Sequence, residues 1–287
     1  MLKLAILGCE NSHANTFIDF VVDKKVVDDV EFIGVYSEDA EAMAKLTDKY
    51  GIPGVDSVDA FVGKVDGIII TARNGANHYK YAKPYIESGI PMFIDKPITN
   101  ESSEAVEFMR DLKAHGVKIS GGSCLMYANY IQKLKEIAGK EETELFGGHF
   151  SAPMSYENAY GGFPFYAQHL VQMVTAVFGN KVNSLHAFKN GKAINVVFHY
   201  DKFNVTAEYV DRRYNYYASV STAEGIEFSE FNLDGTFLAE FMEYYNLLMG
   251  NIPSEDYSEF IVPVFIINAI ERSIVSGKEE PVGAVEV

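Results

Sequence analysis

Residues 65–71 form an apolar run in which hydrophobic side chains do not alternate with polar ones. A strand of this kind is typical of a sheet that is covered on both faces. A helix is predicted over residues 78–88, with Pro84 either beginning it or kinking it. A second apolar run follows over residues 91–94. Strand, helix and strand in this order predict a parallel unit.

The same rhythm begins at the N-terminus. Residues 4–8 predict a strand, residues 13–22 a helix, and residues 30–36 a second strand. Three such units within about a hundred residues predict a doubly wound nucleotide-binding fold.

Lys96 stands directly after the apolar run 91–94 and Asp95, and Pro97 follows it. Proline has no N–H to donate to a sheet and favours extended geometry in the residue before it. The Lys96 side chain is therefore expected to leave the sheet at its carboxyl edge, where open α/β sheets bind ligands. The alternative is an exposed lysine paired with Asp95.

The run 65–71, then His78, then Asp95-Lys96-Pro97 resemble the Gfo/Idh/MocA family of oxidoreductases. The family's acidic-Lys-Pro motif falls on the last three of these residues, and the resemblance covers the whole chain. It implies an α/β Rossmann domain followed by an α+β domain built on an open, mostly antiparallel sheet. It also implies oxidoreductase activity on sugars or cyclitols with NAD or NADP.

Length and composition agree with two domains. The chain has 287 residues, of which 48% are hydrophobic, enough for two ordinary cores. The pattern changes near Gly121-Gly122-Ser123. We therefore expect a dinucleotide-binding domain over residues 1–122 and a substrate and oligomerisation domain over residues 123–287.

The charge and cysteine content exclude several classes of protein. A formal net charge of −16 opposes binding to nucleic acid. No apolar run approaches the roughly 20 residues that span a bilayer, so a cytoplasmic protein without a membrane partner is expected. Cys9 and Cys124 lie in apolar surroundings and predict reduced, buried thiols, and no metal site is expected.

Polar and apolar residues alternate over 203–209 and 214–220, as in strands with one buried face. A helix with apolar residues at helical spacing over 237–248 is expected to cover that face, and a last helix is expected to end at Gly277. The exposed face suits a subunit interface or a sugar platform, since tyrosine is plentiful in this part of a chain that has 18 in all. We expect a homodimer or homotetramer.

The loop after the first strand departs from the dinucleotide fingerprint. Gly8 supplies the glycine of the tight turn, but Glu10 and His13 occupy the second and third glycine positions. A carboxylate facing a diphosphate is repulsive unless it points away. Asn11 and Ser12 are expected to cap the helix, Ser12 to bond a phosphate, and His13 to lie over the same site. The alternative is a simple cap followed by a surface histidine.

The second strand ends at Ser37, where an acidic residue normally accepts hydrogen bonds from the adenosine ribose. Glu38 follows it and would repel a 2′-phosphate, so NAD is favoured and NADP remains possible. The other residues expected to contact the cofactor are Thr71, Arg73, Asn74, His78, Lys96 and Pro97.

The segment from Gly161 to His169 resembles the family's Gly-Gly to His motif. In relatives an aspartate precedes the histidine by four residues, and here Phe165 stands in its place. We expect His169 to take or give the hydroxyl proton, because histidine titrates near neutral pH. Lys96 would orient the hydroxyl and stabilise negative charge, and Tyr166 would share the same helix face. The alternative for His169 is a helix-start histidine bonded to a nearby carbonyl.

The leading hypothesis is an NAD(P)-dependent oxidoreductase of a sugar, polyol or related carbohydrate derivative. Glu10, His13 and Phe165 motivate a rival hypothesis, a non-catalytic ligand-binding or regulatory protein of the same fold. Elimination or glycoside cleavage with a retained nicotinamide is a third possibility.

Overall fold

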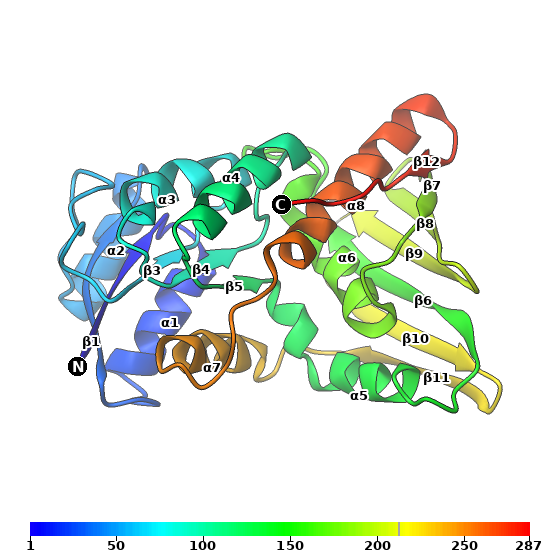
Figure 1. Ribbon diagram of the computed structural model, residues 1–287, viewed down its shortest axis with the longest axis horizontal. Coiled ribbons are helices and arrows are strands. Elements are labelled where there is room, and N and C mark those ends of the chain that lie inside the picture. The colour runs from blue at the N-terminus through cyan, green and yellow to red at the C-terminus, as the bar shows by residue number, and fades with distance from the viewer. Residues whose placement is uncertain (212) are drawn as a thin grey trace. The chain divides into compact units, whose positions relative to one another are not determined.

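The computed structural model describes residues 1–211 and 213–287. The chain forms two compact units, each with its own sheet (Figure 1). The first comprises residues 1–122, 237–260 and Val287, and the second comprises residues 123–236 and 261–286. One sheet is parallel with five strands and the other is mostly antiparallel with seven, so the predicted fold class is confirmed.

The first unit is a doubly wound α/β fold. Its strands are all parallel and lie in the order β2-β1-β3-β4-β5. They are β1 (Leu2–Leu7), β2 (Val30–Tyr36), β3 (Gly67–Ile70), β4 (Met92–Asp95) and β5 (Ile119–Gly122). The helices between them are α1 (Ser12–Val22), α2 (Ala40–Tyr50), η1 (Gly75–Asn77), α3 (His78–Ile86) and α4 (Ser102–Ala114). Every residue of β3 and β4 is buried, as their unalternated apolar sequences predict.

Helix α3 is shorter than the sequence predicted. It ends at Ile86, and Pro84 lies inside its last turn. The missing N–H of Pro84 and the clash of its ring with the preceding turn favour an end close to this position. Pro84 therefore neither begins the helix nor interrupts its middle.

Helix α7 (Thr236–Leu248) belongs to the first unit from Phe237 onwards, although it was expected to cover the second sheet. It packs beside α1 (Figure 1), with the rings of Phe17 and Phe241 5.4 Å apart. The Tyr244 hydroxyl donates to the carbonyls of Ile68 and Pro91, at 3.1 and 3.0 Å. The apolar spacing correctly identified a buried face, but such spacing does not specify which sheet the face contacts.

The second unit is built on a seven-stranded sheet of order β11-β10-β6-β9-β8-β7-β12. The strands are β6 (Leu145–Met154), β7 (Ser184–Asn190), β8 (Ala193–His199), β9 (Asn204–Asp211), β10 (Tyr216–Thr222), β11 (Gly225–Phe231) and β12 (Glu280–Pro281). Strands β6 and β9 pair in parallel, and the other pairings within this unit are antiparallel. Its helical elements are η2 (Cys124–Tyr127), α5 (Asn129–Ala138), α6 (Pro164–Phe178) and most of α8 (Tyr257–Ser276).

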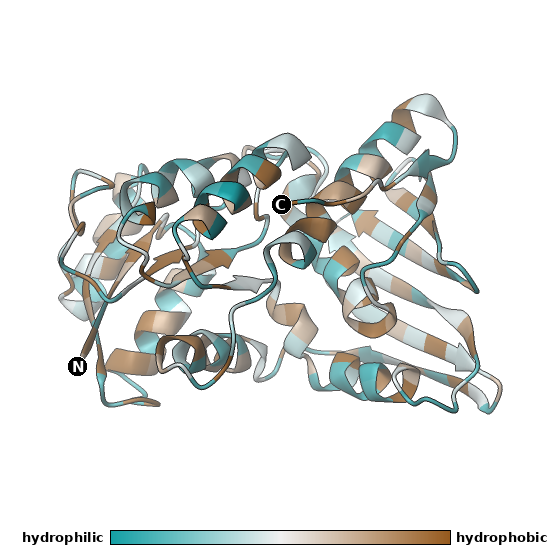
Figure 2. Cartoon of the chain, viewed as in Figure 1, coloured by the Kyte–Doolittle hydropathy of each residue, from teal (hydrophilic) through white to brown (hydrophobic). Residues whose placement is uncertain are grey.

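The expected alternation is present in this sheet. Val205, Ala207 and Tyr209 of β9 are buried, and the residues between them are more exposed. Figure 2 shows the result as brown and pale bands along these strands. Helices α5, α6 and α8 supply the apolar side chains that pack on the sheet's buried face. Helix α8 ends one residue before Gly277, as predicted.

No helix in the described part of the chain combines the length and the apolar character needed to cross a membrane.

Candidate functional site

The turn after β1 is pressed against the end of β3. Gly8 has a φ of +77°, and a Cβ at this position would lie 2.4 Å from the backbone nitrogen of Ala72. Thr71, fully buried, donates through its hydroxyl to the Gly8 carbonyl at 3.0 Å. Only glycine fits such a close approach with this backbone geometry, which is the first requirement of a dinucleotide loop.

Helix α1 begins without the side-chain cap that the sequence predicted. Asn11 occupies the N-cap position but makes no capping hydrogen bond. Its amide instead donates to the Asp95 carboxylate, at 2.7 Å. Ser12 is exposed, and its hydroxyl donates to the Asn11 side-chain oxygen at 3.3 Å. Backbone N–H groups at a helix start that lack a side-chain cap can donate to an anion such as a phosphate.

Glu10, in the same loop, is held by residues that follow β2 and β3. One carboxylate oxygen accepts a hydrogen bond from the Ser37 hydroxyl at 2.7 Å, and the other accepts from the Arg73 backbone N–H at 3.0 Å. Ser37 is buried, and its hydroxyl also accepts from the Asp39 backbone N–H at 3.0 Å. The carboxylate is thus engaged by the β2 and β3 loops.

Lys96 follows β4 directly and is only 5% exposed. It is therefore not the exposed lysine of the alternative interpretation. Its backbone N–H donates to the Asp95 carboxylate at 2.6 Å. The other Asp95 oxygen lies 3.2 Å from Nδ1 of His13, and Nε2 of His13 lies 3.0 Å from a carboxylate oxygen of Glu240 on α7. Asp95, His13 and Glu240 are all almost completely buried.

Asp95, His13 and Glu240 form a group that we call the acidic-histidine cluster. Burial sets the protonation of all three side chains. It raises the pKa of Asp95 to about 6, against the opposing effect of His13 and Lys96. It also raises the pKa of Glu240 well above its usual value, and it lowers the pKa of His13. The arrangement with the least buried charge has a protonated Glu240, a neutral His13 and an ionised Asp95 near the Lys96 ammonium.

His13 is therefore buried and faces this cluster, and it is not a surface residue. Glu240 was missed by the sequence analysis. It lies three residues after Phe237 and four before Tyr244, so the helical spacing already placed it on the buried face of α7. An acidic residue at such a position was the signal for a buried charged cluster.

The loops after β3 and β4 hold the remaining residues expected near the cofactor. His78, the first residue of α3, is fully buried, and its Nε2 lies 2.8 Å from the Ala72 carbonyl oxygen. Burial lowers the pKa of His78 to about 4, so the ring is neutral at physiological pH. The Asn74 side-chain oxygen accepts hydrogen bonds from the Ala76 backbone and the Asn100 amide. Pro97 is buried directly after Lys96.

In the second unit, His169 lies on the second turn of α6 and is 8% exposed. Its Nδ1 lies 2.6 Å from the Ser123 hydroxyl, which also accepts a hydrogen bond from the Leu125 backbone N–H. Tyr166, one turn earlier, meets the His169 ring edge to face at 5.6 Å. The Ser123 hydroxyl is thus one partner of the His169 ring that the sequence analysis did not predict.

Phe165 makes aromatic contacts at the position where the resemblance implied an aspartate. Its ring lies 4.9 Å from that of Tyr160 and 5.0 Å from that of Tyr166. The Ser123 hydroxyl can donate to Nδ1 of His169 or accept from it, so it permits either tautomer. A hydroxyl provides no charge to stabilise an imidazolium, as an aspartate would.

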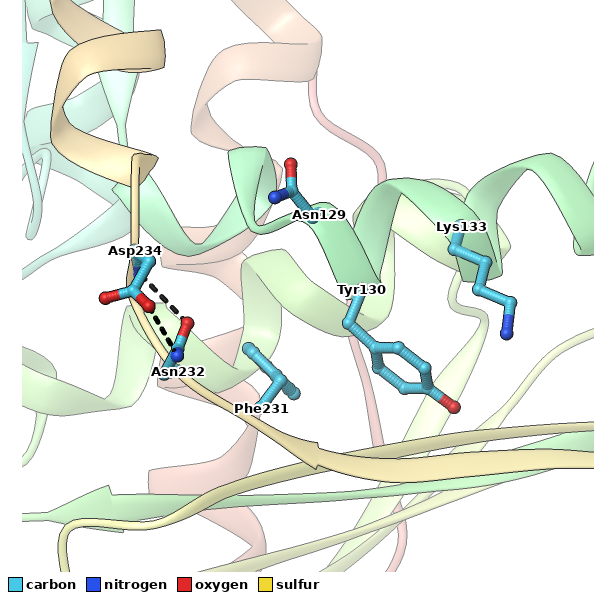
Figure 3. Close-up of a pocket in the computed structure, with 6 residues that line it drawn as sticks. All are labelled: Asn129, Tyr130, Lys133, Phe231, Asn232 and Asp234. Carbon is cyan, nitrogen blue, oxygen red and sulfur yellow. Dashed lines mark hydrogen bonds between the residues drawn. The ribbon is translucent and has the colours of Figure 1, made fainter.

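A pocket of about 360 Å³ lies between α5 and the end of β11 (Figure 3). Asn129, Tyr130, Lys133, Phe231, Asn232 and Asp234 line it. None of the residues expected to bind the cofactor or to act in catalysis is among them.

A comparison with models of protein families finds a match in the first part of the chain. Residues 2–123 match the model of the Gfo/Idh/MocA family, described as an oxidoreductase family with an NAD-binding Rossmann fold. Over these residues the chain is similar to the Gfo/Idh/MocA family. The resemblance found in the sequence is thereby supported for the first domain, and NAD is the cofactor of the family's Rossmann domain.

Solved structures show the same fold over the whole chain. A myo-inositol dehydrogenase from Corynebacterium glutamicum superposes with a TM-score of 0.86 at 14% identity, covering 99% of this chain and 100% of its own. A scyllo-inositol dehydrogenase from Lactobacillus casei with bound NAD(H) and scyllo-inositol gives 0.83 at 12%, covering 98% and 99%. GenD2 from gentamicin A biosynthesis, in complex with NAD, gives 0.85 at 13%, covering 99% and 97%. No curated protein matches the sequence.

The residues of the first unit fit a dinucleotide. Gly8 makes the close turn, and the first amides of α1 have no side-chain cap. Both carboxylate oxygens of Glu10 bond to the β2 and β3 loops. The repulsion expected between Glu10 and a diphosphate is therefore lessened, because the carboxylate is directed to other donors.

Proposed function

We propose that this protein transfers hydride between NAD and a hydroxyl-bearing carbon of a sugar, polyol or related carbohydrate derivative. The observation that carries the proposal is the buried Lys96 at the carboxyl end of β4, in the family's acidic-Lys-Pro motif. The inositol dehydrogenases among the proteins of like fold support a polyol substrate.

Each proposed catalytic residue has a distinct task. NAD, when bound, supplies the acceptor or donor of the hydride. The Lys96 ammonium donates a hydrogen bond to the substrate hydroxyl and stabilises the negative charge that develops on its oxygen. His169 accepts or returns the hydroxyl proton at Nε2, while Ser123 orients the ring through Nδ1. Tyr166 packs against the same ring and limits its rotation.

Turnover measurements on single variants test these tasks. We expect Lys96→Met and His169→Gln each to lower kcat by at least ~100-fold, the usual contribution of general acid–base catalysis. Inositols, aldoses and polyols are screened with NAD, and reduced nicotinamide is followed by absorbance. His115→Gln is the matched control, because His115 lies at the exposed end of α4 and its ring contacts the Asp111 carbonyl of its own helix.

Direct titration separates binding from chemistry. Calorimetry with NAD and with NADP is performed on the same preparations, and circular dichroism confirms that the variants are folded. The redox proposal is wrong if neither dinucleotide binds at millimolar concentration. The assignment of Lys96 and His169 is wrong if both variants turn over as fast as the His115→Gln control.

A second candidate function is a non-catalytic ligand-binding or regulatory protein. Phe165, which packs with Tyr160 and Tyr166, favours it, because an aromatic ring stands where the family resemblance led us to expect an aspartate. This candidate predicts no tight dinucleotide binding. A dissociation constant for NAD in the micromolar range would count against it.

We also propose a homo-oligomer that associates through the seven-stranded sheet. Large apolar side chains on its strands are half or more exposed: Phe146, Phe188, Ile226 and Phe228. Exposed apolar groups of this size are typical of interfaces. Size-exclusion chromatography with light scattering distinguishes a dimer or tetramer from a monomer.

A further inference from the structure

The end of β2 lacks the acidic residue that usually binds the adenosine ribose. Ser37 occupies the position. The two acids that follow it are engaged elsewhere. Glu38 is 54% exposed and forms an ion pair with Lys80 at 2.7 Å. Asp39 caps α2 by accepting a hydrogen bond from the Ala42 backbone N–H at 2.9 Å.

Glu10 brings a carboxylate to this place from a different strand. Its hydrogen bond with the Ser37 hydroxyl fixes it at the end of β2, although it lies in the loop after β1. Ser37 cannot easily turn away, because the Asp39 N–H donates to the same hydroxyl. The Arg73 N–H holds the second oxygen from the β3 side. The carboxylate is therefore fixed between the loops of three adjacent strands.

We propose that Glu10 is the specificity-determining residue that binds the adenosine ribose and selects NAD over NADP. The inference rests on the proposed function, because it concerns the same cofactor. Ser37 acts through Glu10 and is a positioning residue.

The chemistry of a carboxylate supports this role. An ionised carboxylate has about four acceptor positions, and Ser37 and Arg73 use two of them. The others suit the two hydroxyls of a ribose, which are donors. A 2′-phosphate has no donor to offer an ionised carboxylate and repels it instead. A carboxylate in this position therefore favours the dinucleotide that lacks the phosphate.

The test is a comparison of binding constants. NAD and NADP are titrated by calorimetry into the wild-type protein and into Glu10→Gln, which keeps the shape and removes the charge. We expect the wild type to bind NAD at least ~10-fold more tightly than NADP, and Glu10→Gln to lose ~10-fold in NAD affinity. The preference for NAD should shrink in the variant, because NADP no longer meets a negative charge.

Glu38→Gln is the matched control. It removes an acid from the same strand end, but one that is paired with Lys80 and half exposed. The sequence predicted that Glu38 repels a 2′-phosphate, but its charge is paired with Lys80. We therefore expect Glu38→Gln to leave both affinities within about twofold of the wild type, as is usual for a screened surface pair. Glu10→Asp, which keeps the charge on a shorter side chain, should preserve the preference for NAD while weakening binding.

The outcomes separate this inference from the proposed function. If NAD binds the wild type but the ratio of NAD to NADP affinity is the same in Glu10→Gln, the inference alone is overturned. If Glu10→Gln binds NAD more tightly than the wild type, Glu10 obstructs the cofactor and the inference is again overturned. If the wild type binds neither dinucleotide, the proposed function fails, and this inference fails with it.

Discussion

Individual residues in the acidic-histidine cluster are buried at a high cost in solvation. Glu240, His13 and Asp95 together carry two potential negative charges, and Lys96 is the nearby cation that acts on all three. The structure accommodates them because Glu240 keeps its proton. The stability of the first unit should therefore depend on pH through this side chain.

We expect Glu240→Gln to become more stable relative to the wild type as the pH rises. The pKa of Glu240 is raised on folding, so its contribution is complete below the unfolded pKa of 4.5 and is lost as the pH rises towards the folded pKa. The wild type loses up to ~1.4 kcal/mol per pH unit in this interval. His13 makes the opposite contribution to the pH dependence of stability, because its pKa is lowered on folding. This contribution is present in both proteins and so does not affect the comparison.

The measurement is the difference in Tm between the two proteins at about pH 5 and about pH 8, where each kcal/mol corresponds to roughly 2–4 °C. Glu243→Gln, on the same helix but outside the cluster, is the control for replacing an acid on α7. A Tm difference that does not change with pH would show that Glu240 is ionised in both states.

The sequence predicted the positions of residues that lie directly after a strand. Gly8 and Lys96 follow the ends of β1 and β4, as their position after apolar runs predicted. The orientation of Glu10 was not predictable, because its partner Arg73 is 63 residues away and competes with the α1 amides for the carboxylate. The Ser123 partner of His169 was missed for the same reason, with 46 residues between them.

Among the elements, the loop between β1 and α1 is fixed by its close contact with the end of β3. Gly8→Ala should destabilise the protein by more than ~2 kcal/mol, because it combines left-handed backbone strain with a clash at Ala72. Gly51→Ala separates the two effects. Gly51 also has a positive φ, +69°, but nothing lies within 4 Å of a Cβ there, so only the strain of ~1 kcal/mol remains.

Thermal unfolding of both variants gives the comparison. Equal losses of Tm in Gly8→Ala and Gly51→Ala would mean that the contact with Ala72 relaxes without cost. A larger loss at Gly8 measures how rigidly the first loop is held against β3.

The spacing of apolar residues predicted the helices and strands better than it predicted which sheet each helix packs on. Strands β2, β9 and β10 were predicted well because burial on one or both faces determines their pattern. Helix α7 was predicted as a helix, but its apolar face would suit either sheet. The Tyr244 hydroxyl helps to hold α7 on the first unit, because it donates to the carbonyls of Ile68 and Pro91. These residues are more than 150 positions away in the sequence, so the spacing of apolar residues in α7 cannot predict them as partners.

In the whole molecule, segments of the two units alternate along the chain. The expected boundary divided the sequence once, after residue 122, whereas the structure returns residues 237–260 to the first unit. The core of this unit includes Phe241, Tyr244 and Leu247 from α7. A fragment of residues 1–122 would leave the apolar partners of these side chains, such as Phe17 and Phe20, exposed to water.

We expect the fragment 1–122 not to unfold cooperatively when heated, because it lacks α7. Joining residues 236–260 to it through a flexible Gly/Ser linker should restore a single transition, followed by circular dichroism. A joined fragment carrying Tyr244→Ala and Phe241→Ala serves as the control and should behave like the fragment without α7. Cooperative unfolding of 1–122 alone would contradict the prediction.

The return of α7 to the first sheet has a consequence for synthesis. A ribosome makes the five parallel strands early, but the helix that completes their core emerges only after the whole antiparallel sheet except its last short strand. The first unit cannot complete its core until more than a hundred further residues have been translated, which takes about ten seconds at typical rates. Until then its aromatic side chains remain exposed to water. During that interval it is a natural client for chaperones.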